Sequence, residues 1–309
     1  MTKEGKSQSW WDWWQTIPGV LTATAGIITA VTGLIVALNQ SGLFAKKDEA
    51  HTELTGIAKP QPGSTPKTTS SMIPDAAKAL FFDDFSGSRL DPRWKILNHN
   101  PSKTTLQPEK GTLLIVAERG SIRQRATNLK NQYVLNITLP KGKYEVIAKA
   151  SLQIQSTYNS ISLGLFKDDD NFLEIIYWGR PSTDIQFPDG ADSDFYRTVS
   201  FTKEELGQRS GFSTLKSADM HGSSKAPWHF LFKLERNGNE YTGYFAPFST
   251  ERPPETIDQV RWRKLGTHAW IDFDGKVSLW ARNGNSKIHG KGRPREVAAE
   301  FDFVLVREK

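Results

Sequence analysis

The chain has 309 residues, no cysteine and a formal net charge of +6. Without cysteine, disulfides, thiolate metal sites and cysteine nucleophiles are excluded. The excess of Lys and Arg is small for this length, so it suits proximity to anionic lipid better than binding of nucleic acid, which is not an expected partner.

Residues 1–15 form a Trp-rich tail directly before a long apolar segment. The tail contains Trp10, Trp11, Trp13 and Trp14. Because indole rings favour the headgroup level of a bilayer, the tail indicates one membrane interface.

Residues 16–44 are predicted to form a single transmembrane helix. No charged side chain occurs from Ile17 to Leu38, and about 20 apolar residues cross a hydrocarbon core. A cleavable signal peptide fits less well, because the apolar region is too long and no convincing cleavage site follows it. Lysines flank both ends, so the positive-inside rule does not decide the orientation. We expect a single-pass protein of the cell membrane with its C-terminal domain outside the cytoplasm, because short tails rarely cross ahead of long domains.

Small residues recur along this helix with a period of seven, alternating at spacings of four and three. They are Gly19, Ala23, Gly26, Ala30, Gly33 and Ala37. Such a stripe lets two helix backbones approach closely in lipid. We therefore expect homo-oligomers formed through the helix. The alternative is that Gly and Ala are simply common in membrane helices.

Residues 45–78 have the composition of a flexible linker, with the Pro-, Ser- and Thr-rich run KPQPGSTPKTTSS at 59–71. A flexible chain of this length has a typical end-to-end reach of about 30 to 35 Å. The linker would hold the following domain near the bilayer.

From residue 79 to 309 the sequence predicts an all-β domain, because apolar and polar residues alternate with a period of two. The expected strands lie in 81–85, 112–118, 144–154, 161–166, 171–178, 228–236, 239–245 and 300–306. Short strands with frequent turns are typical of a two-sheet antiparallel jelly-roll sandwich.

Turn residues refine this prediction. Asn237-Gly238 and Asp274-Gly275 each favour a tight type I′ hairpin, and the acidic run 168–170 favours a turn before the next strand. The segment FTKEELG at 201–207 is expected to be a short helix.

Four blocks carry a resemblance to a known family: FFDDFSGSRLDPRW at 81–94, LGLFKDDDNFLEIIYW at 163–178, FLFKLERNGNEYTGYF at 230–245 and AEFDFVLV at 299–306. In this order they resemble the C-terminal β-sandwich of glycoside hydrolase family 43 β-xylosidases, and more broadly the concanavalin A-like lectin/glucanase fold. The resemblance implies a jelly roll that often accompanies carbohydrate chemistry. The chain departs from it in lacking the catalytic propeller and in a longer insertion at 181–227.

No catalytic residues are expected. The E-x-D-x-x-E strand motif of retaining glucanases, which sets two carboxylates about 5 Å apart, is absent, and Glu174 stands alone on its strand. Histidines occur without a G-x-S-x-G elbow, so a Ser/His/Asp site has little support.

A calcium ion is the one cofactor considered. Asp84 and Asp302 lie on the first and last expected strands, which commonly pair in such sandwiches, and carboxylates suit calcium. The alternative expectation is that the protein has no cofactor.

Ligand binding is predicted on one face of the sandwich, where aromatic rings would stack on sugar rings. By strand parity this face carries Glu174, Trp178, Trp280 and Arg282, with Gln153 and Tyr244 as neighbours. The alternative is that both tryptophans pack beneath the 181–227 segment. A basic run, which comprises Arg282, Lys287, His289, Lys291, Arg293 and Arg295, either meets lipid headgroups or is simply solvated.

The expected function is therefore a membrane-anchored, lectin-like protein that binds a glycan or another cell-envelope ligand without catalysis, clustered through its helix. Two alternatives stay open: a signalling or assembly module with the sandwich as its sensor, and a glycosidase with an unrecognised site.

Overall fold

The computed structural model describes residues 79–123, 126–181, 195–215, 228–248, 254, 256–284 and 296–309. The Trp-rich tail, the predicted anchor with its small-residue stripe and the linker lie outside these residues, as does the part of the basic run from Lys287 to Arg295. In the described part, no helix is long and apolar enough to span a membrane.

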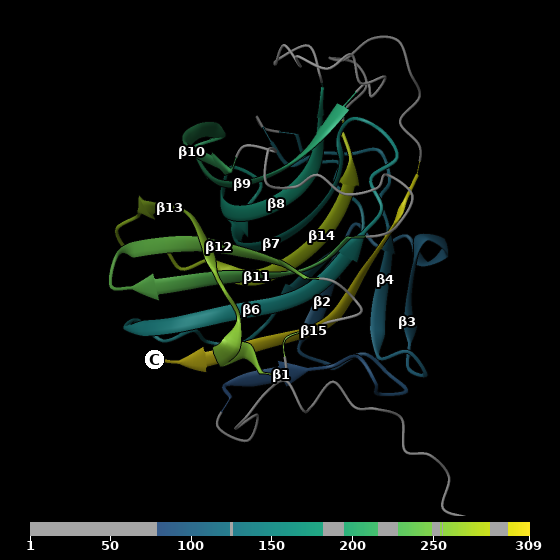
Figure 1. Ribbon diagram of the computed structural model, residues 1–309, viewed down its shortest axis with the longest axis horizontal. Coiled ribbons are helices and arrows are strands. Elements are labelled where there is room, and N and C mark those ends of the chain that lie inside the picture. Colours follow the sequence, from purple (N-terminus) through teal and green to yellow (C-terminus); the bar gives the residue numbers. More distant parts are fainter. Residues whose placement is uncertain are drawn as a thin grey trace, which may run out of the picture. The chain divides into compact units, whose positions relative to one another are not determined.

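The described chain folds into two antiparallel sheets (Figure 1). Sheet A has, in spatial order, β13 (Arg263–Ala269), β12 (Glu240–Phe248), β11 (Trp228–Asn237), β6 (Lys143–Leu152), β15 (Ala298–Glu308), β4 (Thr112–Val116) and β3 (Thr104–Gln107), and β1 (Phe81–Asp83) also pairs with β15. Sheet B has β10 (Gln208–Leu215), β9 (Phe195–Glu205), β8 (Asn171–Pro181), β7 (Asn159–Asp168), β14 (Lys276–Asn283), β5 (Gln132–Leu135) and β2 (Trp94–Leu97). Two short 3-10 helices, η3 (Pro101–Lys103) and η6 (Ile257–Gln259), lie in connections. The predicted all-β, jelly-roll-like sandwich of two sheets is confirmed.

The alternation of side chains places the core between the sheets. On β6, Tyr144, Val146 and Ala148 are buried in the main apolar cluster, and Leu173 and Ile175 on β8 of sheet B belong to the same cluster. Apolar burial stabilises such a core by roughly 25 cal/mol per Å². The predicted period-two pattern is therefore confirmed on these strands.

Terminal strands pair as expected, because β1 lies against β15 with Phe81 opposite Val306. The acidic turn is also confirmed, with Asp168 opposite Asn171 across a tight hairpin. The hairpin between β11 and β12 forms one residue later than predicted, because Asn237 pairs with Glu240 and Gly238-Asn239 make the turn. Gly238 has φ +62° and Asn239 does not have positive φ, so this turn is not type I′.

The predicted helix at 201–207 is wrong. Residues 195–205 form β9, and the chain turns at Leu206 (φ 53°) and Gly207 (φ 70°) into β10. Phe201 is buried between the sheets while Thr202 faces the other way, which is the period of a strand. The described part of the 181–227 segment therefore extends sheet B by two strands.

The predicted hairpin at Asp274-Gly275 is also wrong, because β13 belongs to sheet A and β14 to sheet B. The connection instead fills one end of the core, where the rings of Trp270 and Phe273 stack at 4.0 Å. A Cβ on Gly275 would lie 2.4 Å from Phe273, so the ring packs where only glycine fits. Burial of the Trp270 and Phe273 rings therefore outweighs the preference of Asp274-Gly275 for a tight hairpin turn.

Candidate functional site

The outer face of sheet B, which looks away from the core, brings together most of the predicted ligand-binding residues. On β8, Leu173, Ile175 and Tyr177 fill the core, so Glu174 and Trp178 face outward. The same alternation on β14 turns Trp280 outward from Leu279 and Ala281, and Trp280 belongs to a separate cluster on that face. The predicted parity of both strands is confirmed.

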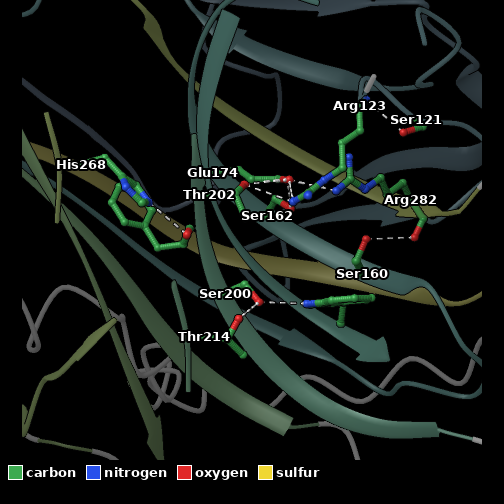
Figure 2. Close-up of polar contacts among 12 residues, drawn as sticks. Ser121, Arg123, Ser160, Ser162, Glu174, Ser200, Thr202, Thr214, His268 and Arg282 are labelled. Atoms are coloured by element: carbon green, nitrogen blue, oxygen red, sulfur yellow. Dashed lines mark hydrogen bonds and ion pairs between the residues drawn. The ribbon is translucent and has the colours of Figure 1, made fainter. Parts of the chain in front are cut away.

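Glu174 is fully buried at the centre of this face and is surrounded by donors (Figure 2). Arg123 donates from Nη2 to Glu174 Oε1 and also to Thr202 Oγ1 at 3.1 Å. Arg282 donates from Nη2 to both carboxylate oxygens, at 3.0 and 3.3 Å. Ser162 donates to Oε2 at 3.0 Å. We call Arg123, Glu174 and Arg282 the Arg-Glu-Arg centre.

Two opposing effects set the protonation of this centre. Burial raises the pKa of Glu174, but the charges of Arg123 and Arg282 and the hydrogen bonds from Arg123 and Ser162 outweigh it and hold that pKa below its ordinary value. Burial lowers the pKa of Arg282, and the charge of Glu174 opposes this effect. A guanidinium does not lose its proton in proteins. The centre therefore holds an ionised carboxylate between two cations at neutral pH.

The described residues of the connection between β4 and β5, 117–123 and 126–131, cover the same face, and we call them the strap. Ile122 and Leu129 of the strap are buried and cluster with Trp280 and Phe172. Arg123 extends from the strap to Glu174. Gly164 on β7 makes room for the indole, because a Cβ there would lie 2.3 Å from Trp280 Cη2. Apolar packing and an ion pair thus fasten the strap to the sheet.

Trp280 is consequently unavailable for stacking on a sugar, because its side chain is fully buried. Tyr244 and Gln153 are not neighbours of the site: Tyr244 lies on β12 of sheet A, where the Lys233 ammonium is 4.4 Å from its ring centroid, and Gln153 follows β6 of the same sheet. The predicted open platform of all six residues is therefore wrong in composition. Strand parity says which face a residue takes, but not which sheet its strand joins.

Trp178 remains partly accessible at one end of this face. Its ring stacks on Tyr158 with centroids 6.1 Å apart and planes 28° apart, and both side chains are half-buried. Trp178 Nε1 donates to Ser200 Oγ at 3.2 Å, and Ser200 shares a hydrogen bond of 3.1 Å with Thr214 (Figure 2). These contacts fix the orientation of the indole. Because its N–H is already bonded to Ser200, the partly exposed ring is the part of Trp178 that a ligand can contact.

Tyr158 is held in place by its backbone. It has φ 67°, and its N–H donates to the carbonyl of Gly179 at 2.6 Å. Gly284 packs closely against it, since a Cβ there would lie 2.5 Å from Tyr158 Cβ. We call Tyr158 and Trp178 together the aromatic pair.

The predicted calcium site is not formed. Asp302 pairs with Lys149, whose Nζ lies 2.6 Å from Oδ2, while Asp84 accepts hydrogen bonds from Ser86. Within the described ranges, no group of three or more His, Asp or Glu side chains is arranged to hold a metal ion. A lysine ammonium neutralises the carboxylate on which the calcium prediction depended.

Sequence reasoning missed two residues of the site, Arg123 and Tyr158. Both lie in connections between strands, where no periodicity predicts which face a side chain covers. An unpaired acidic residue in the middle of an apolar strand, as in NFLEIIYW, was the available indication that a basic partner must reach Glu174.

Comparisons with known proteins give structural matches alone, since no family model matches the chain and no curated protein does. The GH43 BlXynB protein from Bacillus licheniformis matches with a TM-score of 0.53 at 16% identity, over 74% of this chain and 39% of that chain. The Bacteroides ovatus xyloglucan protein GH43B matches with a TM-score of 0.50 at 13% identity, over 74% and 39% of the two chains.

A Bacillus licheniformis β-glucanase matches with a TM-score of 0.47 at 12% identity, over 74% of this chain and 98% of that chain. This chain spans 39% of the length of the two GH43 structures. At these identities the likeness is one of fold. The described domain thus shares the fold of a two-sheet β-sandwich with part of the two GH43 structures.

Proposed function

We propose that this protein is a membrane-anchored, non-catalytic binding protein for glycans of the cell envelope. The aromatic pair carries the proposal, because an indole whose orientation is fixed and whose ring stays partly exposed is suited to stack on a sugar ring. Trp178 stacks on Tyr158 at 6.1 Å and stands opposite Ser160 on β7 and Thr198 on β9.

The Arg-Glu-Arg centre supports binding without hydrolysis. A glycosidase needs one carboxyl group that carries a proton and a second carboxylate beside it. Glu174 has a lowered pKa, is fully buried and already accepts bonds from two guanidinium groups. It is therefore unsuited to donate a proton to a leaving group.

The predicted anchor gives this binding a location. Residues 16–44 would hold the sandwich at the cell membrane on the linker of residues 45–78. Oligomers formed through the small-residue stripe would bring several aromatic pairs together, which raises the avidity of weak single sites.

The test is a glycan array probed with the full chain in detergent micelles, together with Trp178→Ala. We expect the wild type to bind glycans on the array and Trp178→Ala to bind them about tenfold more weakly or worse. The expectation takes the contribution of a sugar ring stacked on one aromatic side chain to be similar to that of a stacked base, about 1–3 kcal/mol. Trp262→Ala is the matched control, since Trp262 lies against the outer face of sheet A. An array without hits would refute glycan binding, and equal losses for both variants would refute the assignment to the aromatic pair.

A further inference from the structure

We infer that His268 is a pH-sensitive contact: its neutral ring holds the edge strand β10 in place, and protonation of the ring releases β10 and loosens the aromatic pair. The inference goes beyond the proposed function, because it holds whatever ligand the aromatic pair binds. It follows from the packing of β10 against the ring, from the surroundings of the two ring nitrogens and from a hydrogen bond between β10 and the support of Trp178.

The strand β10 lies at the edge of sheet B, where β9 is its partner in the sheet. Its register with β9 shifts between Arg209 and Gly211, and residues 208–210 and 212 are exposed. Segments with exposed backbone and few buried contacts open at a lower free energy than the core of a domain. Contacts from the other sheet therefore matter for keeping β10 closed.

These contacts come from β13 of sheet A. A Cβ on Gly211 of β10 would lie 2.6 Å from His268 Nδ1, and a Cβ on Gly266 of β13 would clash with Ser213 of β10. The two glycines let the edge strands approach until the histidine ring lies against the backbone of β10. The same ring packs on Phe201 of β9, with ring centroids 4.6 Å apart. His268 thus joins β13 to both β9 and β10.

The two ring nitrogens of His268 have different surroundings (Figure 2). Nε2 lies 3.2 Å from the carbonyl oxygen of Phe201. A carbonyl oxygen only accepts hydrogen bonds, so in the neutral ring Nε2 carries the proton and Nδ1 does not. Nδ1 lies on the side of Gly211. The proton that the ring gains in acid is therefore added at Nδ1, against β10.

The environment of the ring opposes this second proton. Burial lowers the pKa of His268 below its ordinary value of 6.5, the hydrogen bond with the Phe201 carbonyl opposes this effect, and the charge of Lys203 adds to it. A ring released from the contact regains its ordinary pKa. The open form therefore binds the proton more tightly than the closed form, and closure of β10 loses stability as the pH falls below about 6.5.

The groups that face the ring do not reverse this direction. Lys203 on β9 is the charged group that affects the pKa of His268 among the described residues, and Glu205 pairs with its ammonium at 2.9 Å. Tyr241 on β12 lies opposite His268, and burial raises the pKa of its phenol, so it stays neutral. On β10, Arg209 is a cation and would disfavour a second positive charge nearby.

The strand β10 also supports the aromatic pair. Thr214, three residues after Gly211, shares a hydrogen bond of 3.1 Å with Ser200 on β9. The same Ser200 oxygen accepts the hydrogen bond from Trp178 Nε1 at 3.2 Å (Figure 2). When β10 leaves, the Ser200 hydroxyl loses the partner that fixes its direction. The indole is then held less firmly in the orientation that we propose for binding.

The experiment measures hydrogen exchange of the full chain in detergent micelles by mass spectrometry, at pH 7.5, 6.5 and 5.5. Exchange rates are converted to protection factors, which removes the intrinsic effect of pH on exchange. We expect the protection of residues 208–215 to fall about threefold or more between pH 7.5 and 5.5, and that of β7 in the middle of sheet B to stay constant. Hydroxyl-radical labelling should oxidise Trp178 about twofold faster at the lower pH, because a loosened indole is more accessible.

Variants assign the response to His268. His268→Gln keeps an N–H donor for the Phe201 carbonyl but does not titrate, so the protection of β10 should no longer depend on pH. His229→Gln is the matched control, because burial also lowers the pKa of His229, yet its ring lies beside Phe248 in sheet A. This variant should keep the full response. Lys203→Gln removes the neighbouring cation and should reduce the response, which provides a second test if His268→Gln does not fold.

Three results overturn the inference: protection of β10 that does not change with pH in the wild type, the same pH dependence in His268→Gln, or oxidation of Trp178 that stays constant while the protection of β10 falls. None of these measurements needs a glycan. A glycan array without hits would therefore refute the proposed function and leave this test intact, so the two failures are distinguishable.

Discussion

Glu174 illustrates how one buried carboxylate holds together two separate parts of the fold. Its carboxylate is fully buried, where an unpaired ion would cost several kcal/mol, so it is stable only with cationic partners. One partner, Arg282, comes from the neighbouring part of sheet B, and the other, Arg123, comes from the strap. The two arginines neutralise the carboxylate, and Arg123 at the same time holds the strap against the sheet.

We expect Glu174→Gln to lower the free energy of unfolding by about 3–5 kcal/mol at pH 7, because two guanidinium groups then stay buried without their carboxylate. The fold lowers the pKa of Glu174 below its ordinary value of 4.5. Its stabilising contribution is therefore present above about pH 4.5 and is lost as the pH falls through the lowered pKa. Denaturant unfolding followed by tryptophan fluorescence from pH 3 to 7 measures both effects, and the variant should lack this acid-dependent loss.

Arg123→Leu provides the control. It should cost less in the Glu174→Gln background than in the wild type, because in that background it removes a cation that has lost its partner. Equal costs in the two backgrounds would show that Arg123 and Glu174 are not coupled.

At the scale of secondary-structure elements, two edge strands pack tightly against each other at one side of the sandwich, β10 of sheet B and β13 of sheet A. The ring of His268 on β13 lies 4.6 Å from that of Phe201, and its Nε2 is 3.2 Å from the Phe201 carbonyl oxygen (Figure 2). On β10, a Cβ added to Gly211 would lie 2.6 Å from His268 Nδ1. Contact this close leaves no room for a side chain, so glycine at 211 is a packing requirement.

We expect Gly211→Ala to destabilise the sandwich by about 1–3 kcal/mol, the usual cost of overpacking. In a His268→Ala background, the destabilisation caused by Gly211→Ala should fall by more than half, because the new methyl group clashes with the histidine ring. Gly142→Ala is the matched control, because nothing lies within 4 Å of a Cβ at that position. Thermal unfolding of the four variants measures the coupling, and an identical cost with and without His268 would contradict it.

The strap shows why the outer face of sheet B differs from an open groove. Its residues 122 and 129 are apolar and bury against Trp280, so the middle of the face becomes a second small core. The aromatic pair, with Trp178 on β8 and Tyr158 just before β7, stays partly exposed. The binding surface that we propose is accordingly short, which suits a single sugar or two.

For the whole molecule, a short binding surface makes clustering important. A single stacked sugar gives weak binding, and linked copies raise the effective concentration of the remaining sites, by 10²- to 10⁴-fold in overall avidity under favourable geometry. The small-residue stripe of the predicted anchor would supply this linkage.

We expect Gly26→Leu with Gly33→Leu to reduce crosslinked oligomers of the full chain in membranes, because bulky side chains separate the helix backbones. Binding to a polymeric glycan should weaken in parallel, while binding to a short oligosaccharide should not change. Val31→Leu, off the stripe, is the control. Unchanged crosslinking in the double variant would exclude association through this stripe.

The sequence by itself determined the fold class and the facing of its main strands. In NFLEIIYW the alternation of apolar residues predicted that Glu174 and Trp178 share a face, and Arg282 was assigned to it on the same ground. These predictions succeeded because a period of two follows from backbone geometry and needs no knowledge of neighbouring strands.

The tertiary structure alone decided which strands are neighbours and what covers them. Tyr244 has the expected periodicity but belongs to the other sheet, and Trp280 faces outward but lies beneath the strap. Residues 201–207 and the connection at Asp274 follow burial of Phe201 and Phe273 against their local preferences. Local sequence carries no information on contacts between distant segments, so only the tertiary structure places Arg123 and Tyr158, which lie in connections between strands, at the site.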